Sequence, residues 1–411
     1  MITAPIISIS VTYMYGLLNF QLLIEVVNLK IFKNKTCLIS LIFSFYKNCK
    51  FSTYPLQFCI YITINTFMLE IGIGMFGDLT FDHASQKFQP TSQKLREIVE
   101  QVCLADELGI DVIAIGEHHR PDYSVSSPEV ILAALSTVTK RIKLASGVTV
   151  LSSSDPVKVY QDFATVDLLS DGRAEIIAGR GSFIESYPLF GYDLKDYESL
   201  FEEKLDLLLK INTTEKLTWS GKHRASLVNQ TVHPRAERPI PVWIAVGGTP
   251  ESVFRAARLG LPLIVAIIGG QPRQFKPLIG FYKEEYLKHG HDPDNMQIGV
   301  HSHTFVTDSD DQLIQNYFPY YAAQMDRVGR SRGWAPYSIQ QFLGGLTKDG
   351  ALYMGEANLV AEKIIEAIEM FGLTRYVAHM DVGGPPHKEM MRNIELFGNK
   401  VMPQIRKAFE N

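Results

Sequence analysis

From Leu69 onward, short apolar runs alternate with longer segments in which apolar residues recur every three or four positions. The first pattern predicts buried β-strands, and the second predicts amphipathic helices. The apolar runs lack strict polar alternation, which is typical of parallel strands covered on both faces. Eight strands are predicted: Glu70–Phe76, Val112–Gly116, Ile142–Leu151, Arg173–Gly179, Val242–Val246, Leu263–Ile268, Gln297–Thr307 and Arg375–Val382. Because a closed β/α barrel needs eight strand–helix units, an α/β fold of the TIM-barrel type is expected.

Helices are predicted between these strands, for example over Ser92–Leu108 and Pro128–Thr139. Two longer segments, Leu194–Pro241 and Asn316–Gly350, interrupt the alternation. Long insertions in such a fold usually shape access to a functional site. We therefore expect one barrel domain, residues 68–411, with both insertions at the C-terminal rim.

The first 67 residues, Met1–Phe67, have a different composition. They contain no Asp, Arg, His or Trp and a single acid, Glu25. Met1–Ile24 is uncharged and long enough to span a bilayer, which favours a membrane anchor. Against this, amide and hydroxyl side chains dilute the run, and no basic region precedes it. We favour the alternative that this segment is upstream sequence translated from a mistaken start, or disordered, and that Met68 is the natural first residue.

The bulk composition excludes some classes of partner. The 411 residues are 46% hydrophobic and 20% charged, which is ordinary for a folded soluble protein. A net charge of −4 and a pI near 6.3 imply no broad cationic surface, so no nucleic acid is expected as a partner. Four cysteines show neither zinc-site spacing nor a disulfide framework, which favours the cytoplasm. No membrane contact is expected if the first 67 residues are not native.

Candidate chemistry gathers directly after two predicted strands. Glu117-His118-His119-Arg120 follows Val112–Gly116, and Arg180-Gly181-Ser182 follows Arg173–Gly179. Two imidazoles and a carboxylate at the end of a buried strand must be hydrated or paired, so packing alone explains them poorly. In parallel β/α folds the chemistry collects at the carboxyl edge of the sheet. We therefore predict His118, Glu117 and His119 as catalytic residues.

An anion site is predicted on the same rim. Arg180 can present a fork of donors to a phosphate or carboxylate. Gly247-Gly248-Thr249-Pro250-Glu251-Ser252 follows the fifth strand and opens a helix predicted over Ser252–Leu259. Backbone amides, a hydroxyl N-cap and proline at the first helical position make a helix N-terminus suited to anions. The same residues alone would be an ordinary cap. With Arg180 after a neighbouring strand, phosphate binding is favoured.

Ser146-Gly147 lies in the middle of the predicted strand Ile142–Leu151. Glycine there thins the barrel wall and would let a planar ring approach the backbone. A plain β-bulge explains the glycine equally well at this stage.

Two further motifs are considered and set aside. Gly72-x-Gly74-x-x-Gly77 matches a dinucleotide-binding fingerprint by letter, but its glycines lie inside the first predicted strand with no helix straight after them. Small residues beneath a flat ligand explain them more simply. His301-x-His303 on a strand would point both rings the same way and could hold a metal. No carboxylate or cysteine joins the pair at ligand spacing, so no metal site is predicted.

Four segments occur in an order that is specific in combination: Gly116-Glu117-His118-His119, Lys143-Leu144-Ala145-Ser146-Gly147-Val148, Leu169-Ser170-Asp171-Gly172-Arg173 and Gly179-Arg180-Gly181. Together they resemble the bacterial luciferase-like flavin-dependent oxidoreductases. The resemblance extends from Leu69 to about Phe409. The segment Gly247–Ser252 further resembles a branch of that family whose members mostly lack assigned substrates.

The resemblance implies an eight-fold β/α barrel that binds FMN, usually as a dimer. In the family, the residues that match Arg180 and Gly248–Ser252 hold the flavin phosphate. The strand that matches Ser146-Gly147-Val148 supports the isoalloxazine ring, often through a non-prolyl cis peptide. The histidine that matches His118 lies beside the reactive face of the flavin. The expected cofactor-binding residues are therefore Ser146, Gly147, Val148, Arg180, Gly247, Gly248, Thr249 and Ser252.

The function predicted from these residues is an FMN-dependent monooxygenase that uses reduced flavin and oxygen on a small organic substrate. Because no NAD-binding domain is evident, a separate flavin reductase is an expected partner, and the chain is expected to form a homodimer. His118, whose ordinary pKa is near neutrality, would take or give a proton. Three alternatives stay open: a hydride-transferring enzyme that uses a deazaflavin coenzyme, a metal-dependent hydrolase barrel, and a non-catalytic flavin-binding protein.

The substrate pocket is expected between Phe76–Phe88, Phe183–Tyr192 and the insertion Asn316–Gly350. Aromatic residues in that insertion suggest an apolar or planar compound. The same aromatics would also suit lid packing or a dimer face.

Overall fold

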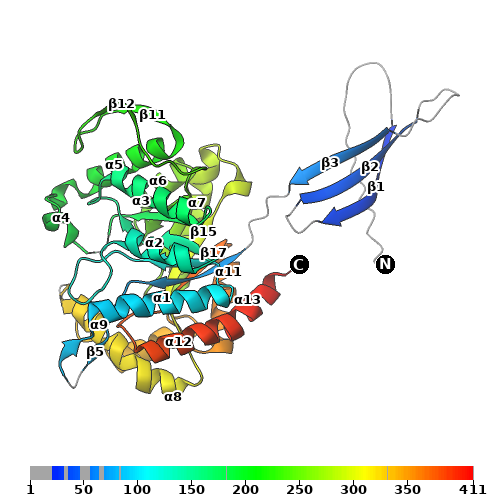
Figure 1. Ribbon diagram of the computed structural model, residues 1–411. Helices are drawn as coiled ribbons and strands as arrows, with labels where there is room; N and C mark the ends of the chain where they lie inside the picture. The colour runs from blue at the N-terminus through cyan, green and yellow to red at the C-terminus, as the bar shows by residue number, and fades with distance from the viewer. Residues whose placement is uncertain are drawn as a thin grey trace. The chain divides into compact units, whose positions relative to one another are not determined.

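The computed structural model describes residues 21–31, 36–46, 56–63, 69–82, 85–181, 183–330 and 332–410. The chain divides into two compact units, Met1–Phe67 and Met68–Asn411 (Figure 1). In the first unit, β1 (Gln21–Ile31), β2 (Thr36–Tyr46) and β3 (Leu56–Thr63) form an antiparallel sheet in that order. Met68, the predicted first residue, lies outside the described residues, as does most of Met1–Ile24, the segment considered as an anchor, so the predicted mistaken start stays a prediction. Among the described residues, no helix is long and apolar enough to cross a membrane.

The second unit is a closed parallel barrel. Its strands pair in the order β13-β14-β15-β17-β4-β7-β8-β10, and β10 pairs with β13 to close the ring. The eight strands are β4 (Glu70–Met75), β7 (Val112–Ile115), β8 (Lys143–Ser146), β10 (Ala174–Gly179), β13 (Val242–Val246), β14 (Leu263–Ala266), β15 (Ile298–Thr307) and β17 (Arg375–His379). All eight coincide with predicted strands, so the predicted TIM-barrel class is confirmed.

Helices follow the strands and cover the outside of the barrel. The longer ones are α1 (Thr91–Glu107), α2 (Pro128–Val138), α3 (Pro156–Leu169), α5 (Tyr197–Thr213), α6 (Pro250–Arg258), α7 (Lys276–Lys288), α11 (Ala357–Phe371), α12 (His387–Leu396) and α13 (Met402–Phe409). In Figure 1, α1, α12 and α13 run along one side of the barrel. Their apolar faces pack on the outward side chains of the strands, which places the main core between sheet and helices.

The interior of the barrel is filled by side chains. A small apolar cluster, which includes Ala114, Ile177 and Trp243, occupies its middle. At the amino-terminal end, the fully buried Arg375 donates to Glu70 (Nε–Oε2, 2.8 Å) and to Glu175 (Nη1–Oε2, 2.6 Å). This plug leaves the carboxyl end of the barrel for chemistry.

The predicted strand Ile142–Leu151 is interrupted. Its first part, β8, and its second part, β9 (Thr149–Val150), both pair with β10. Ala145 pairs with Glu175, and Thr149 pairs with Ala178. Three residues lie between the first members of these pairs and two between the second, so the β8–β9 side carries one extra residue, a β-bulge. The peptide bond between Gly147 and Val148 in this bulge is cis. The bulge and the non-prolyl cis peptide are both confirmed.

The first insertion forms a hairpin, β11 (Lys216–Trp219) and β12 (Leu227–Thr231), that packs beside α5. Its turn reaches the rim, where Arg224 Nε lies 2.8 Å from Asp155 Oδ2 at the start of α3. The second insertion contains α9 (Phe318–Arg330) and α10 (Ile339–Leu346), followed by β16 (Tyr353–Glu356), which pairs with the outer half of β15. It follows the carboxyl end of β15, so its predicted place at the rim is confirmed.

Candidate functional site

The imidazole of His118, directly after β7, lies in an aromatic enclosure at the mouth of the barrel. Its ring stacks on Tyr123 at a centroid distance of 4.2 Å and meets Phe76 at 4.6 Å. Phe183 closes the enclosure edge-on at 5.3 Å. His118 is buried, and its Nδ1 has no hydrogen-bond partner among the described residues. A buried nitrogen between aromatic faces needs a partner that the described residues do not supply, which makes this place a candidate ligand site.

Burial, with a smaller contribution from His379, lowers the pKa of His118 to about 3. The ring is therefore neutral near pH 7. This corrects the expectation of a histidine that titrates near neutrality, because the apolar surroundings disfavour the imidazolium. As it stands, His118 is a neutral hydrogen-bonding group.

Glu117 and His119 turn away from this enclosure. Glu117 Oε1 lies 2.9 Å from His119 Nε2, and its Oε2 accepts a hydrogen bond of 2.8 Å from the backbone amide of Val150. The His119 ring contacts Phe190 edge-on. The pair therefore ties the end of β7 to β9. This geometry favours a positioning role over the predicted catalytic role for both residues.

Three more histidines line the same mouth. His301 and His303 project from β15, and His379 ends β17. His303 Nδ1 lies 2.8 Å from the hydroxyl of Tyr321 on α9, whereas His301 Nε2 finds no partner in the described part of the chain. Burial, followed by repulsion from His379, lowers the pKa of His301 to about 3. Burial likewise lowers the pKa of His303 well below its ordinary value, so His118, His301 and His303 are neutral imidazoles at this mouth.

Carboxylates lie beside these histidines, although the sequence shows none at ligand spacing. Atoms of Asp78, His379 and Asp381 lie within 4.8 Å of one another and could geometrically hold a metal ion. The Asp381 oxygens, however, accept hydrogen bonds from the amides of Phe76 (2.9 Å) and Gly77 (2.8 Å). Burial would raise the pKa of Asp381, but His379 and nearby Lys94 lower it to about 2. The carboxylate thus anchors the loop after β4.

The predicted anion-binding residues meet on one side of the rim. Arg180 follows β10, and its Nη2 lies 3.3 Å from Oγ1 of Thr249, the N-cap residue of α6. Thr249 makes no capping hydrogen bond with its hydroxyl within the described chain, contrary to the expected cap. Pro250 is the first helical residue, so the helix begins two residues earlier than predicted. The arginine and the helix N-terminus therefore lie side by side on the rim, and their binding of an anion stays a prediction.

Thr249 lies between two exposed glycines that precede it and a buried serine on the first turn of α6. Gly247 and Gly248 are exposed, and Gly248 has a φ of +130°, a conformation that favours glycine. A Cβ added at Gly247 would meet no atom within 4 Å. Ser252, on the first turn of α6, is buried, and its hydroxyl has no partner in the described segments. Backbone amides, a guanidinium and an orphan hydroxyl fit a phosphate.

The β8–β9 bulge lies between β7, which precedes His118, and β10, which precedes Arg180. Ser146 is fully buried, and its hydroxyl accepts a hydrogen bond of 3.1 Å from the amide of Ile177, so it completes the strand ladder. A Cβ on Gly147 would lie 2.8 Å from Cβ of Ala114, so glycine here permits close strand packing. Val148 is half-buried and packs against the interior apolar cluster, with its Cγ2 2.8 Å from the position of a Cβ on Gly179. Of the three, Val148 is best exposed to a ligand.

Similar packing explains the glycines of the first strand. A Cβ on Gly72 would lie 2.6 Å from Cγ1 of Val112, and one on Gly74 would lie 2.8 Å from Nε2 of His301. The suggestion that they lie beneath a flat ligand is therefore replaced by close packing against the neighbouring strand and His301.

Sequence reasoning missed Tyr123, His379 and Asp381. His379 and Asp381 fell inside the predicted strand Arg375–Val382, whereas β17 ends at His379, so the rule that selects polar residues just after a strand passed over them. Tyr123 carried no such signal, because it lies in a loop and joins the site only through stacking.

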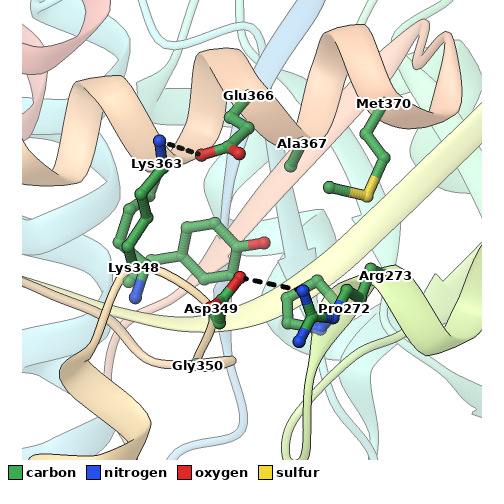
Figure 2. A pocket seen from close by; sticks show the side chains of 10 residues that line it. Pro272, Arg273, Lys348, Asp349, Gly350, Lys363, Glu366, Ala367 and Met370 are labelled. Carbon is green, nitrogen blue, oxygen red and sulfur yellow. Dashed lines mark ion pairs between the residues drawn. The ribbon is translucent and has the colours of Figure 1, made fainter.

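A separate pocket lies beside α11 (Figure 2). Its charged side chains pair among themselves: Arg273 Nη1 lies 3.5 Å from Asp349 Oδ1, and Lys348 Nζ lies 3.9 Å from Glu366 Oε2. The ammonium group of Lys363 donates to three backbone carbonyls before β16. The pocket is lined by none of the predicted site residues. The hydrogen bonds of Lys363 anchor the end of the second insertion.

The family model described as luciferase-like monooxygenase matches residues 75–379. The match spans more than half of the chain and both parts of the site. The chain therefore belongs to the luciferase-like monooxygenase family, and it is an enzyme of the oxidoreductase class.

Among curated proteins, the chain is 25% identical to the uncharacterized protein y4vJ of Sinorhizobium fredii, over 80% of this chain and 97% of that one. It is 25% identical to the F420-dependent glucose-6-phosphate dehydrogenase of Amycolatopsis mediterranei, over 66% of this chain and 75% of that one. It is 24% identical to the oxygenase component of the flavin-dependent trigonelline monooxygenase of Acinetobacter baylyi, over 78% and 92%. Both flavin-dependent and F420-dependent enzymes are thus among its relatives.

Solved structures support the same fold. Monooxygenase RslO1 from Streptomyces bottropensis superposes with a TM-score of 0.69 at 22% identity, covering 82% of this chain and 99% of that one. The oxygenating constituent of 3,6-diketocamphane monooxygenase from Pseudomonas putida gives a TM-score of 0.64 at 20% identity, with the same coverage.

Proposed function

We propose that the chain is an FMN-dependent monooxygenase that acts with reduced flavin and oxygen on a small organic substrate. One observation carries the proposal: the order of His118, Val148, Arg180 and Thr249 along four consecutive barrel strands, β7, β8–β9, β10 and β13. This order supplies an aromatic enclosure at one end and an anion site at the other. A tricyclic ring with a phosphorylated side chain has the same two ends.

The donor set fits such a cofactor. Arg180, Thr249 and the buried hydroxyl of Ser252 would hold the phosphate, and Val148 would support the ring. Reduced FMN, when bound, supplies the electrons that activate oxygen. The chain's own residues position the ring and keep water out, because Phe76, Tyr123 and Phe183 line the place of reaction.

His118 would act as a neutral group. Its Nδ1 is free to hydrogen-bond with cofactor or substrate, and its low pKa keeps the ring from being protonated near pH 7. It can donate or accept one hydrogen bond and pass a proton only transiently. The neutral rings of His301 and His303 extend this lining toward α9, where a substrate would enter.

A second candidate is a hydride-transferring enzyme with a deazaflavin coenzyme. The relatives that use F420 favour it, since a deazaflavin also presents a tricyclic ring and a phosphate. The residues that would hold FMN would serve it equally well.

The expected partners follow from the proposal. A separate flavin reductase would supply reduced FMN, as the name "oxygenase component" of the trigonelline enzyme suggests for that relative. A homodimer is supported by apolar side chains on the outer faces of the adjacent α2 and α3: Val130 (62% exposed), Val138 (51%) and Leu169 (52%). We keep the cytoplasm as the proposed location.

Binding measurements on purified protein test the proposal. FMN and F420, each oxidised and reduced, would be titrated against the chain, followed by exposure of the reduced complexes to oxygen. We expect reduced FMN to bind and to be reoxidised on the protein. Arg180→Ala should weaken FMN binding, whereas His118→Ala should retain it but slow the oxygen reaction. Binding of F420 alone would favour the second candidate.

A further inference from the structure

Glu198, on the first turn of α5, carries a carboxylate directly against the guanidinium of Arg180. The other carboxylate oxygen, Oε2, lies 3.2 Å from Nη2 of Arg255 on α6. Glu198 therefore bridges two arginines, one of which belongs to the proposed phosphate site. An anion that belongs to the chain itself already neutralises Arg180.

We infer that Glu198 competes with the cofactor phosphate for Arg180 and moves onto Arg255 when the phosphate binds. The inference rests on the proposed function, and it makes the cofactor an exchangeable co-substrate, not a permanently held group. It assigns Glu198 as a residue that sets how tightly a phosphorylated ligand is held.

Arg180 cannot easily leave its place. Its guanidinium carbon lies 4.9 Å from the ring centre of Tyr197, and the Tyr197 hydroxyl donates a hydrogen bond of 3.2 Å to the carbonyl of Gly181. Arg180 also donates to Thr249 at 3.3 Å. With the guanidinium fixed between these groups, a phosphate that approaches the start of α6 meets Nη2 beside Thr249, while Glu198 occupies Nη1 of the same guanidinium. Because two anions near one arginine repel each other, one must leave.

The Glu198 side chain is partly exposed, and a second arginine lies within its reach. Its side chain is 55% exposed, so it regains water when released. Arg255 is only 7% exposed, and its Nε and Nη1 find no hydrogen-bond partner within the described residues. These unused donors lie on the guanidinium that Glu198 already touches at Nη2, so a shifted carboxylate could pair with Nη2 and one of them. Burial of unpaired donors is costly, which favours this second position once Arg180 is occupied.

Glu202 provides a matched control. It lies one turn further along α5, and its Oε1 contacts Arg255 Nη2 at 3.0 Å. Its side chain is 62% exposed, close to the exposure of Glu198. It has no ion pair with Arg180 among the described contacts. Glu202→Gln therefore removes the same charge from the same helix without freeing the phosphate site.

The experiment compares wild type, Glu198→Gln and Glu202→Gln in titrations with FMN, riboflavin and inorganic phosphate. We expect Glu198→Gln to lower the dissociation constants of FMN and phosphate by roughly fivefold, the loss of an exposed competing ion pair. Riboflavin, which lacks the phosphate, should bind all three proteins equally. Glu202→Gln should behave as wild type.

Unchanged or weaker binding of FMN and phosphate by Glu198→Gln would overturn the inference, as would equal tightening by Glu202→Gln. The phosphate titration separates this from the proposed function. If phosphate binds more tightly to Glu198→Gln but no flavin binds to any protein, the competition by Glu198 stands and the flavin assignment fails.

Discussion

The imidazole of His118 lies flat against the phenol ring of Tyr123, with ring centres 4.2 Å apart and planes inclined by 13°. Tyr123 is itself held in place, because its hydroxyl accepts a hydrogen bond of 2.6 Å from Nε2 of Gln324. Gln324 lies on α9 in the second insertion. The insertion therefore sets the plane of the histidine at the mouth of the barrel, although it lies some 200 residues away in sequence.

Replacing Tyr123 by alanine should release the His118 ring. An aromatic pair is stabilised by about 0.5–1.5 kcal/mol, so we expect reoxidation of bound reduced FMN to slow by roughly two- to tenfold. Stopped-flow absorbance of the flavin measures this rate without knowledge of the substrate. Tyr123→Phe keeps the stacked ring and should retain most of the rate. Equal loss in both variants would assign the effect to the hydroxyl instead of the stacking.

The ion cluster at the closed end of the barrel should control stability. Burial alone would raise the pKa of Glu175, but ion pairs with Arg375 and Lys143 lower it to about 2. Arg375→Ala would leave Glu175 buried without its main counter-charge, at a cost of about 3–5 kcal/mol in the free energy of unfolding. Urea denaturation measures this difference.

The control for Arg375 is Arg392→Ala. Arg392 also binds a carboxylate, with Nη2 2.8 Å from Asp308 Oδ1, but its side chain is 48% exposed. Removing such a surface pair should cost less than about 1 kcal/mol. Similar losses in the two variants would mean that the barrel tolerates an unpaired buried Glu175.

Acid should destabilise the fold through the buried histidines. The folded pKa of His301 is lowered to about 3 by burial and by His379, below the ordinary value of 6.5. Only the unfolded chain takes up the proton as the pH falls below that value, so the stability contributed by the neutral ring is complete above pH 6.5 and is lost toward pH 3. Between pH 7 and 5 the loss is about 2 kcal/mol for one such histidine.

His301→Gln should therefore flatten the dependence of unfolding free energy on pH between 7 and 5. Urea denaturation at both values, for wild type and variant, gives the slope. His291→Gln serves as the control, because His291 is not enclosed by the barrel and bonds through Nε2 to the carbonyl of Arg258. A slope that His301→Gln leaves unchanged would show that this ring is not neutral in the folded chain.

The fold was predictable because its strands are local patterns. Barrel strands are buried on both faces, so each appears in the sequence as a short apolar run. Val242–Val246 can therefore be recognised as a strand without tertiary information. Strand breaks are harder, because the interruption of Ile142–Leu151 depends on pairing with β10 and not on the run itself. The path of the β11–β12 hairpin beside α5 depends likewise on contacts with distant residues.

The site was predictable only where the chemistry follows a strand directly. Arg180 and Thr249 came from that rule and do meet at the rim. The rule missed residues that join the site only through tertiary contacts. Glu198 contacts Arg180 from a helix, and Tyr123 contacts His118 from a loop. The direction of neighbouring side chains also escaped it, since Glu117 and His119 bind each other.

Gly116 offers a test of the ring end of the site that leaves the phosphate end intact. A Cβ at this position would lie 2.4 Å from Cδ1 of Phe76, closer than real contacts allow. Phe76 contacts both His118 and His379, at 4.6 and 3.9 Å between ring centres, so its displacement would disturb the enclosure. We expect Gly116→Ala to weaken FMN and riboflavin by the same factor, roughly tenfold for about 1.4 kcal/mol.

Two comparisons make the result of Gly116→Ala interpretable. Arg180→Ala should weaken FMN but not riboflavin, because only FMN carries the phosphate. Gly280→Ala, on α7, adds the same methyl where no atom lies within 4 Å, and it should leave both affinities unchanged. If Gly116→Ala weakens FMN alone, Phe76 does not shape the place of the ring, and the flavin would have to lie elsewhere on the rim.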